Sequence, residues 1–382
     1  MAQEVTLIAT SAMGLESVVA NEIRQLGYEV EVENGKVVFQ APVSAIPRCN
    51  LWLRSGDRIK LQVGKFKATT FVELFEATKA LPWEQFISED GKFPVSGKSV
   101  KSTLHSVPDC QAIVKKAIAE KLKLKYGLAK NMPETGALYK IEVAIHKDEA
   151  ILTLDTSGTG LHKRGYRVGQ GEAPLKETLA AALILLTNWK PELPLIDPFC
   201  GSGTIPIEAA LIGQNIAPGF NREFASENWD FIKARYWDDA FEEAEDKANY
   251  DQVLDITGFD IDHKMIKISN DNAKEAGLGE LVSWKQMQVK DLFLRKDNGY
   301  IIGNPPYGQR IGDREKVSRI YRELGEVMNQ HPSWSVYILT AFEAFEKQYG
   351  KKATKKRKLF NGFIQTNYYQ YFGKKQKEEY GG

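Results

Sequence analysis

Hydrophobic and polar positions divide the chain into three stretches with different periodicities. In the first stretch, residues 1–66, the pattern predicts strands at 5–10 and 58–66 and helices at 12–26 and 46–53, with a hairpin between the helices. The dipeptide Asn34-Gly35 suits the tight two-residue turn of such a hairpin. The order β-α-β-β-α-β predicts a small ferredoxin-like α+β unit.

The second stretch, residues 67–160, predicts another small α+β unit. Its pattern indicates helices at 71–81 and 109–126, a strand-like segment near 98–102, and strands at 139–146 and 149–155. Residues 156–175 are rich in glycine and basic side chains, which is typical of a linker that passes over a surface.

The third stretch, residues 161–382, alternates helices and short apolar strands. Strands are predicted at 193–199, 255–262, 281–288, 300–308 and 335–341, with helices at 176–189, 205–213, 263–277 and 315–330. This alternation predicts a doubly wound, Rossmann-like α/β sheet, in which ligands bind at the carboxyl ends of the strands. The acidic and aromatic segment 213–255 is an excursion of unknown role.

Composition narrows the classes of protein. No apolar run approaches the roughly 20 residues of a membrane span, and the N-terminus lacks the features of a secretory signal, so a cytoplasmic protein is expected. The three cysteines are far apart and the five histidines stand alone, which favours neither disulfides nor a metal site. The net charge of +1 is uninformative, but 351–358 has six basic residues in eight. A solvated surface is the alternative to phosphate binding for such a run.

The first motif, Asp197-Pro198-Phe199-Cys200-Gly201-Ser202-Gly203-Thr204, lies between a predicted strand and a helix. Its glycines allow a sharp turn and a close approach of the backbone to a ligand, although a packing turn is the alternative. A phosphate-binding P-loop is disfavoured because no lysine follows the second glycine, and the dinucleotide fingerprint lacks its third glycine. Cys200 is expected to be a small packing residue and not a nucleophile.

Three aspartates follow the next strands. Asp260 ends one strand and could accept hydrogen bonds from both hydroxyls of a ribose, whereas Asp262 stands where a helix N-cap is expected. Asp291 ends the following strand, where its carboxylate could accept from an adenine amino group or cap a loop.

The segment Gly258-Phe259-Asp260-Ile261-Asp262 is the second motif, and the third is Asn304-Pro305-Pro306-Tyr307, which follows the strand that ends near Gly303. Two prolines make a rigid loop, so its carbonyls and the Asn304 oxygen can form an array of acceptors. An exocyclic base amine is a poor nucleophile, because its lone pair is delocalised into the ring. Acceptors that hold its hydrogens favour a tetrahedral nitrogen, and Tyr307 can stack on the base.

Together these motifs resemble those of class I S-adenosylmethionine-dependent methyltransferases that modify amino groups. The run LHKRGYR…APLKETLAAALI after two small α+β units is similar to the RlmL-type 23S rRNA guanine-N2 methyltransferases that carry a THUMP domain. The resemblance covers nearly the whole chain. It implies S-adenosyl-L-methionine as the cofactor, held by Asp197, Phe199, Cys200, Gly201, Ser202, Gly203, Thr204, Asp260, Ile261 and Asp291, with Pro174, Leu175 and Thr178 closing over it.

The resemblance also implies structured RNA as the substrate, with 23S rRNA favoured and guanine N2 as the methylated nitrogen. Extruding a base costs a few kcal/mol, which the N-terminal units must help to offset by gripping the RNA backbone. The residues expected to contact RNA are Lys98, Lys101, Lys115, Lys116, Lys121, Lys123, Lys163, Arg164 and Arg167. For the lysines of the N-terminal units, a role in surface solubility is the alternative. An adenine-N6 methyltransferase and a noncatalytic RNA-binding or ribosome assembly factor remain the alternatives.

Overall fold

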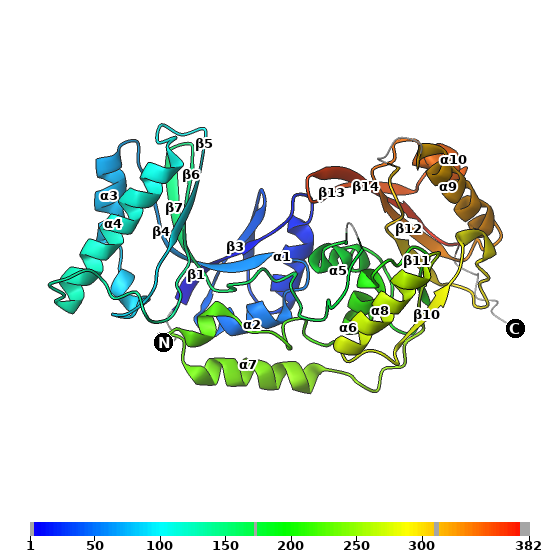
Figure 1. Cartoon of the computed structure of the whole chain (residues 1–382), viewed down its shortest axis with the longest axis horizontal. Coiled ribbons are helices and arrows are strands. Elements are labelled where there is room, and N and C mark those ends of the chain that lie inside the picture. Colours follow the sequence, from blue (N-terminus) through cyan, green and yellow to red (C-terminus); the bar gives the residue numbers. More distant parts are fainter. Residues whose placement is uncertain (1–3, 172–173, 309–312, 375–382) are drawn as a thin grey trace, which may run out of the picture. The chain divides into compact units, whose positions relative to one another are not determined.

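The computed structural model describes residues 4–171, 174–308 and 313–374. Residues 172–173 of the expected linker and residues 375–382 of the expected C-terminal domain lie outside this part. The chain forms two compact units (Figure 1). The first comprises Met1–Ser11, Val19–Leu161 and Gly219–Asp246, and the second comprises Ala12–Val18, His162–Pro218 and Lys247–Gly382. No helix in the described ranges combines the length and the apolar character that crossing a membrane requires.

The first unit contains a seven-stranded sheet in the order β2-β3-β1-β4-β7-β6-β5. The predicted ferredoxin-like order is confirmed in its first part. The elements there are β1 (Glu4–Thr10), α1 (Glu16–Gln25), β2 (Val30–Glu33), β3 (Lys36–Pro42), α2 (Ala45–Trp52) and β4 (Arg58–Lys67). Strand β1 pairs antiparallel with both β3 and β4, and its alternating buried residues, such as Leu7 and Ala9, form part of the core.

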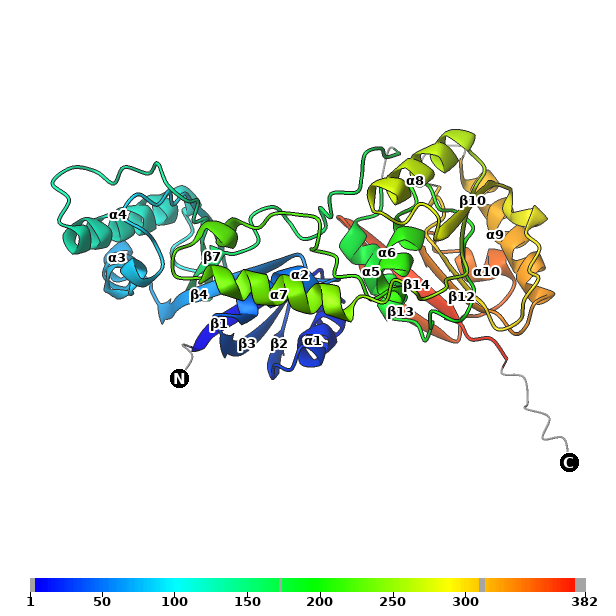
Figure 2. The ribbon, with the colours of Figure 1, turned by 90° about the horizontal axis from the view of Figure 1, so that it is seen from below.

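The second predicted α+β part continues the same sheet. Its elements are α3 (Phe71–Ala80), η1 (Trp83–Gln85), β5 (Val95–Val100), α4 (Val107–Tyr126), β6 (Ile141–His146) and β7 (Glu149–Asp155). Ten-residue β4 pairs with β1 on one side and β7 on the other, with a register shift between Gln62 and Gly64. Helices α3 and α4 lie side by side on this part of the sheet (Figure 2). One strand therefore links the two parts into a continuous sheet.

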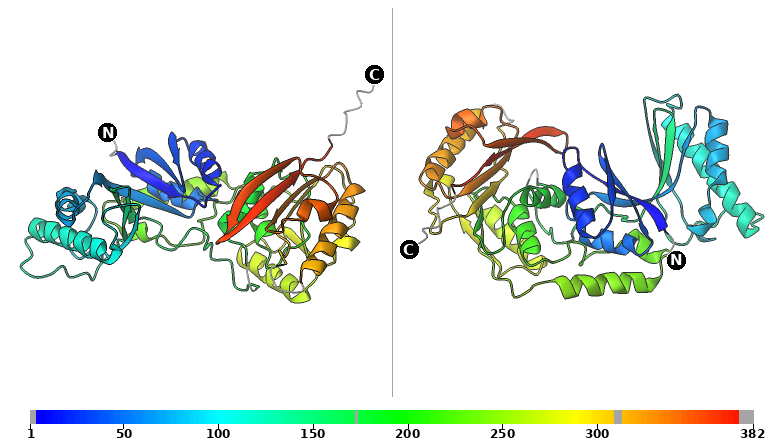
Figure 3. Two further views of the ribbon diagram at one scale, coloured as in Figure 1. Left: turned by 90° about the horizontal axis from the view of Figure 1, so that it is seen from above. Right: turned by 180° about the vertical axis from the view of Figure 1, so that it is seen from behind.

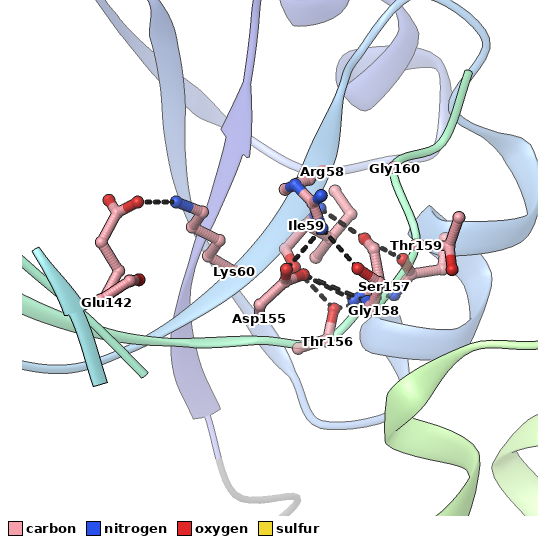
Figure 4. A network of polar contacts seen from close by, with 12 residues as sticks. Arg58, Ile59, Lys60, Glu142, Asp155, Thr156, Ser157, Gly158, Thr159 and Gly160 are labelled. Atoms are coloured by element: carbon pink, nitrogen blue, oxygen red, sulfur yellow. Dashed lines mark hydrogen bonds and ion pairs between the residues drawn. The ribbon is translucent and has the colours of Figure 1, made fainter. Parts of the chain in front are cut away.

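A polar network fixes the turn that follows β7 (Figure 4). The Arg58 guanidinium contacts the Asp155 carboxylate and donates to the Gly158 carbonyl at 2.6 Å, and the Thr156 hydroxyl donates to the Ile59 carbonyl at 2.7 Å. Thr156 and Ser157 are fully buried. The prediction of a linker passing over a surface is therefore wrong at this end, because the segment uses its hydroxyl groups to satisfy backbone groups inside the unit.

The excursion at 213–255 contributes η2 (Ala225–Asn228) and most of α7 (Ala234–Lys247) to the first unit. Arg48 of α2 pairs with Glu243 of α7 through contacts of 2.6 and 2.8 Å. Trp229 stacks on Tyr139 with ring centroids 5.0 Å apart. The segment is therefore packed into the N-terminal unit, although it lies in the sequence between motifs of the C-terminal one.

The second unit has a seven-stranded sheet in the order β10-β9-β8-β11-β12-β14-β13. The neighbouring strands β10, β9, β8, β11 and β12 are all parallel, whereas β14 pairs antiparallel with β12 and with β13. The strands are β8 (Leu195–Asp197), β9 (Ile256–Asp260), β10 (Val282–Gln286), β11 (Tyr300–Gly303), β12 (Ser335–Thr340), β13 (Lys355–Asn361) and β14 (Ile364–Tyr371). The sheet continues through β14 and β13, drawn in red in Figure 3. This hairpin was not predicted.

Helices cover both faces of this sheet, as a doubly wound fold requires. One core includes residues of α5 (Glu177–Leu185), α6 (Thr204–Gly213) and α8 (His263–Glu275). The other includes residues of α9 (Asp313–Asn329) and α10 (Phe345–Tyr349), and η3 (Val289–Asp291) adjoins it. The predicted α/β class is confirmed, and the carboxyl ends of β8, β9 and β11 carry the three motifs.

Candidate functional site

The glycine loop between β8 and α6 is a tight turn shaped by backbone requirements. Gly201 and Gly203 have φ values of +52° and +86°, in the left-handed region that other residues rarely adopt. A Cβ at Gly203 would lie 2.7 Å from Trp284 and 2.8 Å from the Cβ of Ser269, whereas a Cβ at Gly201 would meet nothing within 4 Å. Gly203 therefore allows close packing beneath the loop, and Gly201 leaves open space above it.

Asp260 connects this loop to the end of β9. Its Oδ2 accepts from the Gly201 amide at 3.0 Å and its Oδ1 accepts from the Asp262 amide at 2.9 Å. Since a carboxylate has about four lone-pair positions, acceptor capacity remains for a ligand. The Asp262 carboxylate accepts from the Lys264 amide at 2.8 Å, which confirms the prediction that Asp262 caps α8.

Asp197 is buried beneath the loop and accepts from the Phe199 amide at 3.0 Å. Burial raises the pKa of Asp197 well above its usual range and raises that of Asp260 as well. Burial also raises the pKa of the Cys200 thiol well above its usual range. Cys200 is 6% exposed and its amide donates to the Phe259 carbonyl at 2.8 Å, which agrees with the predicted packing role.

The loop after β11 is held by tyrosines from inside and outside the motif. The Tyr307 hydroxyl donates to the Asn304 Oδ1 at 2.5 Å, and the Asn361 amide donates to the Tyr307 oxygen at 3.3 Å. The Tyr321 hydroxyl donates to the Pro306 carbonyl at 2.8 Å. The Pro306 carbonyl of the loop therefore already accepts one hydrogen bond within the protein. The Asn304 oxygen has one donor and can accept a second hydrogen bond.

These elements line one cleft with a volume of about 530 Å³. Phe199 comes from the glycine loop, Asp260 is the last residue of β9, Ile261 follows it, and Asn304 to Gly308 follow β11. The cleft thus joins the three predicted motifs at one edge of the sheet. Its remaining lining residues are Pro198, Met287, Gln288, Val289, Asp313, Ile320, Glu323, Asn361 and Ile364.

Several of these lining residues were missed by sequence reasoning. Met287, Gln288 and Val289 precede the predicted Asp291, and no motif marks them. Asn361 and Ile364 belong to the unpredicted hairpin of β13 and β14. The basic run at 351–358 drew attention to this region but gave no indication that its strands end at the cleft.

Of the thirteen predicted cofactor residues, Phe199, Asp260 and Ile261 line the cleft. The other ten do not: Asp197, Cys200, Gly201, Ser202, Gly203, Thr204, Asp291, Pro174, Leu175 and Thr178. Asp291 is exposed at the end of η3, where its amide donates to the Gln288 carbonyl at 3.0 Å. Leu175 and Thr178 are 6% and 3% exposed and pack around the start of α5, and Pro174 lies just before them. Gln288 and Val289, which precede Asp291 in the chain, line the cleft instead.

Arg164 and Arg167 are predicted RNA contacts that the structure corrects. Arg164 is 4% exposed and its guanidinium pairs with the fully buried Glu208 at 3.4 Å. Arg167 donates to Glu177 at 2.8 Å, to the Ser202 and Thr204 hydroxyls at 2.9 and 3.0 Å, and to the Leu175 carbonyl at 3.0 Å. Both guanidinium groups therefore bind partners within the second unit, and Arg167 connects the glycine loop to α5.

The remaining predicted RNA contacts have different surroundings. Lys98, Lys115 and Lys121 pair with Glu142, Glu134 and Glu84 at 3.2, 2.7 and 3.7 Å, so their charges are partly compensated. Lys101, Lys116 and Lys163 are exposed, and Lys123 is partly exposed. Lys163 belongs to the second unit, whereas the other six lysines belong to the first.

The fold and the cleft define the class of the protein. A doubly wound sheet carries a glycine loop after its first strand, a carboxylate after the second and an Asn-Pro-Pro-Tyr loop after the fourth. This arrangement is that of a class I methyltransferase, as predicted.

Comparison with known proteins agrees with this class. Family models match residues 6–60 as an RlmL ferredoxin-like domain, 68–155 as a THUMP domain and 164–370 as an RMKL-like methyltransferase domain. The chain belongs to the RMKL-like methyltransferase family.

Two relatives illustrate the extent of the similarity. The protein named "Putative RNA methyltransferase YpsC" of Bacillus subtilis is 64% identical over 97% of this chain and 96% of its own. The ribosomal RNA large subunit methyltransferase K/L of Syntrophotalea carbinolica is 32% identical over 94% of this chain. The chain spans about half the length of that enzyme, 52%.

Two solved structures share the fold over nearly the whole chain. A structure described as a predicted N6-adenine-specific DNA methylase from Listeria monocytogenes is 60% identical, with a TM-score of 0.94 and coverage of 97% of both chains. SMU.472, described as "a putative methyltransferase complexed with SAH", is 48% identical, with a TM-score of 0.95 and coverage of 99% of this chain and 100% of its own. SAH is the demethylated form of the cofactor, and the chain is an S-adenosylmethionine-dependent methyltransferase.

Proposed function

We propose that the protein methylates the exocyclic N2 amine of a guanine in structured RNA, with 23S rRNA as the target. The observation that carries this proposal is the single cleft lined by both Asp260 and Asn304. Asp260 is bonded to the glycine loop, so a cofactor on that loop and a base amine at Asn304 would share one space. The THUMP match and the relatives named as RNA methyltransferases support RNA as the substrate.

The described residues fit S-adenosylmethionine. Asp260 would accept from the ribose hydroxyls, and the apolar Ile261 and Val289 would pack against the adenine, with Gln288 beside it. The loop from Asp197 to Thr204 would hold the methionine part, in the open space above Gly201. When bound, S-adenosylmethionine supplies an electrophilic methyl group.

Asn304 and its loop would orient the amine. The second lone pair of the Asn304 oxygen and a loop carbonyl would accept the two amine hydrogens, which turns the nitrogen lone pair towards the methyl carbon. The nitrogen would then accept the methyl group that the bound cofactor supplies, and it would release one proton to water. Tyr307 would stack on the base, which stabilises an extruded nucleotide by roughly 1 to 3 kcal/mol.

Adenine N6 is the second candidate acceptor. An Asn-Pro-Pro-Tyr loop recognises an exocyclic amine and not a particular ring, and the description of the Listeria structure favours adenine. Incubation of the protein with methyl-labelled S-adenosylmethionine and a 23S rRNA transcript, followed by mass spectrometry of the nucleosides, distinguishes the two. We expect N2-methylguanosine. N6-methyladenosine would overturn the proposed base, and unlabelled RNA together with cofactor binding would favour a noncatalytic RNA-binding factor.

A further inference from the structure

The hairpin of β13 and β14 ends in an exposed aromatic residue beside the cleft. Asn361 pairs with Ile364 across the turn, and both line the cleft. The two residues between them are Gly362, which is exposed with φ of +62°, and Phe363, which is 105% exposed. Phe363 therefore projects from the rim of the cleft into solvent.

The turn does not require a phenylalanine. Gly362 already supplies the left-handed conformation at the first central position, where glycine is preferred in a two-residue hairpin. The second position tolerates polar residues, and a fully exposed ring there loses the benefit of apolar burial. The ring is thus unexplained by local structure or by the cores of the unit.

Positive charge also lies on this hairpin. Lys358 of β13 is exposed three residues before Asn361, whereas the exposed Lys351, Lys352 and Lys355 lie at the end of the hairpin away from the tip. Lysines on an edge strand discourage pairing with other chains, and this could account for the charges. It does not account for Phe363, because an exposed apolar ring at the tip has the opposite effect.

The hairpin is coupled to the Asn-Pro-Pro-Tyr loop. The Asn361 amide donates to the Tyr307 oxygen at 3.3 Å, and Tyr307 donates to Asn304. A base bound at Phe363 would therefore lie two residues along the chain from Asn361, whose side chain contacts the proposed base-binding loop. The combination of a flat ring and nearby positive charge suits a nucleic acid strand, since bases stack on aromatic rings and phosphates bind lysines.

We propose that Phe363 stacks on a base adjacent to the nucleotide that enters the cleft, while Lys358 contacts a neighbouring phosphate. This inference rests on the proposed function for the identity of the substrate as RNA. Stacking at the tip stabilises the strand after one nucleotide has been extruded, because the neighbouring base loses a stacking partner when the target leaves the helix. The hairpin then contributes to substrate recognition and takes no part in the methyl transfer itself.

Substitution of Phe363 tests the proposal in the full-length protein. We expect Phe363→Ala to weaken binding of an unmodified 23S rRNA transcript by roughly 10-fold or more, measured by filter retention with S-adenosylhomocysteine present. Phe363→Tyr should bind within about two-fold of the wild type, because it keeps the flat ring. Phe363→Leu should bind as weakly as the alanine variant, because it is apolar but cannot stack.

Phe372→Ala is the matched control. Phe372 is 49% exposed and follows the opposite end of β14, so loss of this ring should leave RNA affinity unchanged. Equal RNA binding by wild type and Phe363→Ala, or full affinity of Phe363→Leu, would overturn the inference.

Binding and methyl transfer are measured separately. Weak binding by Phe363→Ala alongside a wild type that binds but does not methylate RNA would support the inference and refute the proposed function. A wild type that binds no RNA would overturn both, and unchanged RNA binding by the variant with normal methylation would overturn the inference alone.

Discussion

Tyr307 has two groups that can act on a substrate, a ring that can stack and a hydroxyl that donates to Asn304 at 2.5 Å. Removing the hydroxyl loses the hydrogen bond that it donates to Asn304 and the weaker one that it accepts from Asn361. A hydrogen bond has a net value of about 0.5 to 1.5 kcal/mol. We therefore expect Tyr307→Phe to lower kcat by roughly 2- to 10-fold, and Tyr307→Ala to lower it further because stacking is lost as well. Initial rates at saturating cofactor and RNA measure both effects.

The hydroxyl of Tyr307 is not expected to titrate during catalysis. Burial raises the pKa of Tyr307 to about 12, so the hydroxyl stays protonated and remains a donor across the working range. The wild type and Tyr307→Phe should have pH–rate profiles of the same shape between roughly pH 6 and pH 10. A basic limb in the wild type that disappears in Tyr307→Phe would contradict the assignment of this hydroxyl as a fixed donor.

At the scale of elements, the glycine loop depends on how closely α8 and β10 approach it. A Cβ at Gly203 would meet Trp284 of β10 and Ser269 of α8 at under 3 Å. Because of overpacking, Gly203→Ala should lower the free energy of unfolding by about 1 to 3 kcal/mol more than the same substitution at a left-handed glycine with open space around its Cα. It should also weaken S-adenosylhomocysteine binding. Chemical denaturation and calorimetry measure the two effects.

Gly277→Ala provides the comparison for Gly203→Ala. Gly277 has φ of +74° in the same unit, and a Cβ there would meet nothing within 4 Å. The substitution should cost only the left-handed strain, about 1 to 2 kcal/mol, and leave cofactor affinity intact. Equal destabilisation by the two variants would mean that the packing below the loop does not matter.

Motif spacing predicted the elements that carry the cleft, because strand ends and turn glycines leave local signals. The helix-capping role of Asp262 and the alternation of helices and strands along the C-terminal part of the chain were found in this way. The hairpin of β13 and β14 was missed because its basic run resembles a solvated surface, and its Asn361 reaches the cleft only through tertiary pairing. Arg164 and Arg167 were misassigned because their ion-pair partners, Glu208 of α6 and Glu177 of α5, come close to them only in the folded unit.

At the scale of the whole molecule, the N-terminal unit is proposed to hold RNA through the exposed Lys101 and Lys116 and the partly exposed Lys123. We expect combined reversal of these three lysines to glutamate to weaken affinity for a 23S rRNA transcript. The slope of log binding constant against log salt concentration should become shallower by about one unit for each phosphate that the variant no longer binds. Cofactor affinity should not change. Filter binding over a series of salt concentrations measures the slope.

Lys65 provides the control for this charge reversal. It pairs with Glu149 at 3.0 Å on the sheet of the same unit. Reversal of Lys65 changes the net charge at a position that is not proposed to bind RNA, so the slope should stay near that of the wild type. A loss of RNA affinity equal, per charge, to that of the triple variant would show that net charge alone is responsible.

The central claim is that Asn304 activates an amine within the cleft where the cofactor binds. Asn304→Ala tests it most directly, with methyl transfer to a 23S rRNA transcript and S-adenosylhomocysteine affinity measured on the same preparation. Removal of one preorganised polar group from an active site typically lowers kcat by about 100-fold or more. We therefore expect the rate of methyl transfer to fall by about 100-fold or more, while the Kd for S-adenosylhomocysteine stays within about two-fold of the wild type. Substantial residual transfer at unchanged cofactor affinity would contradict the account.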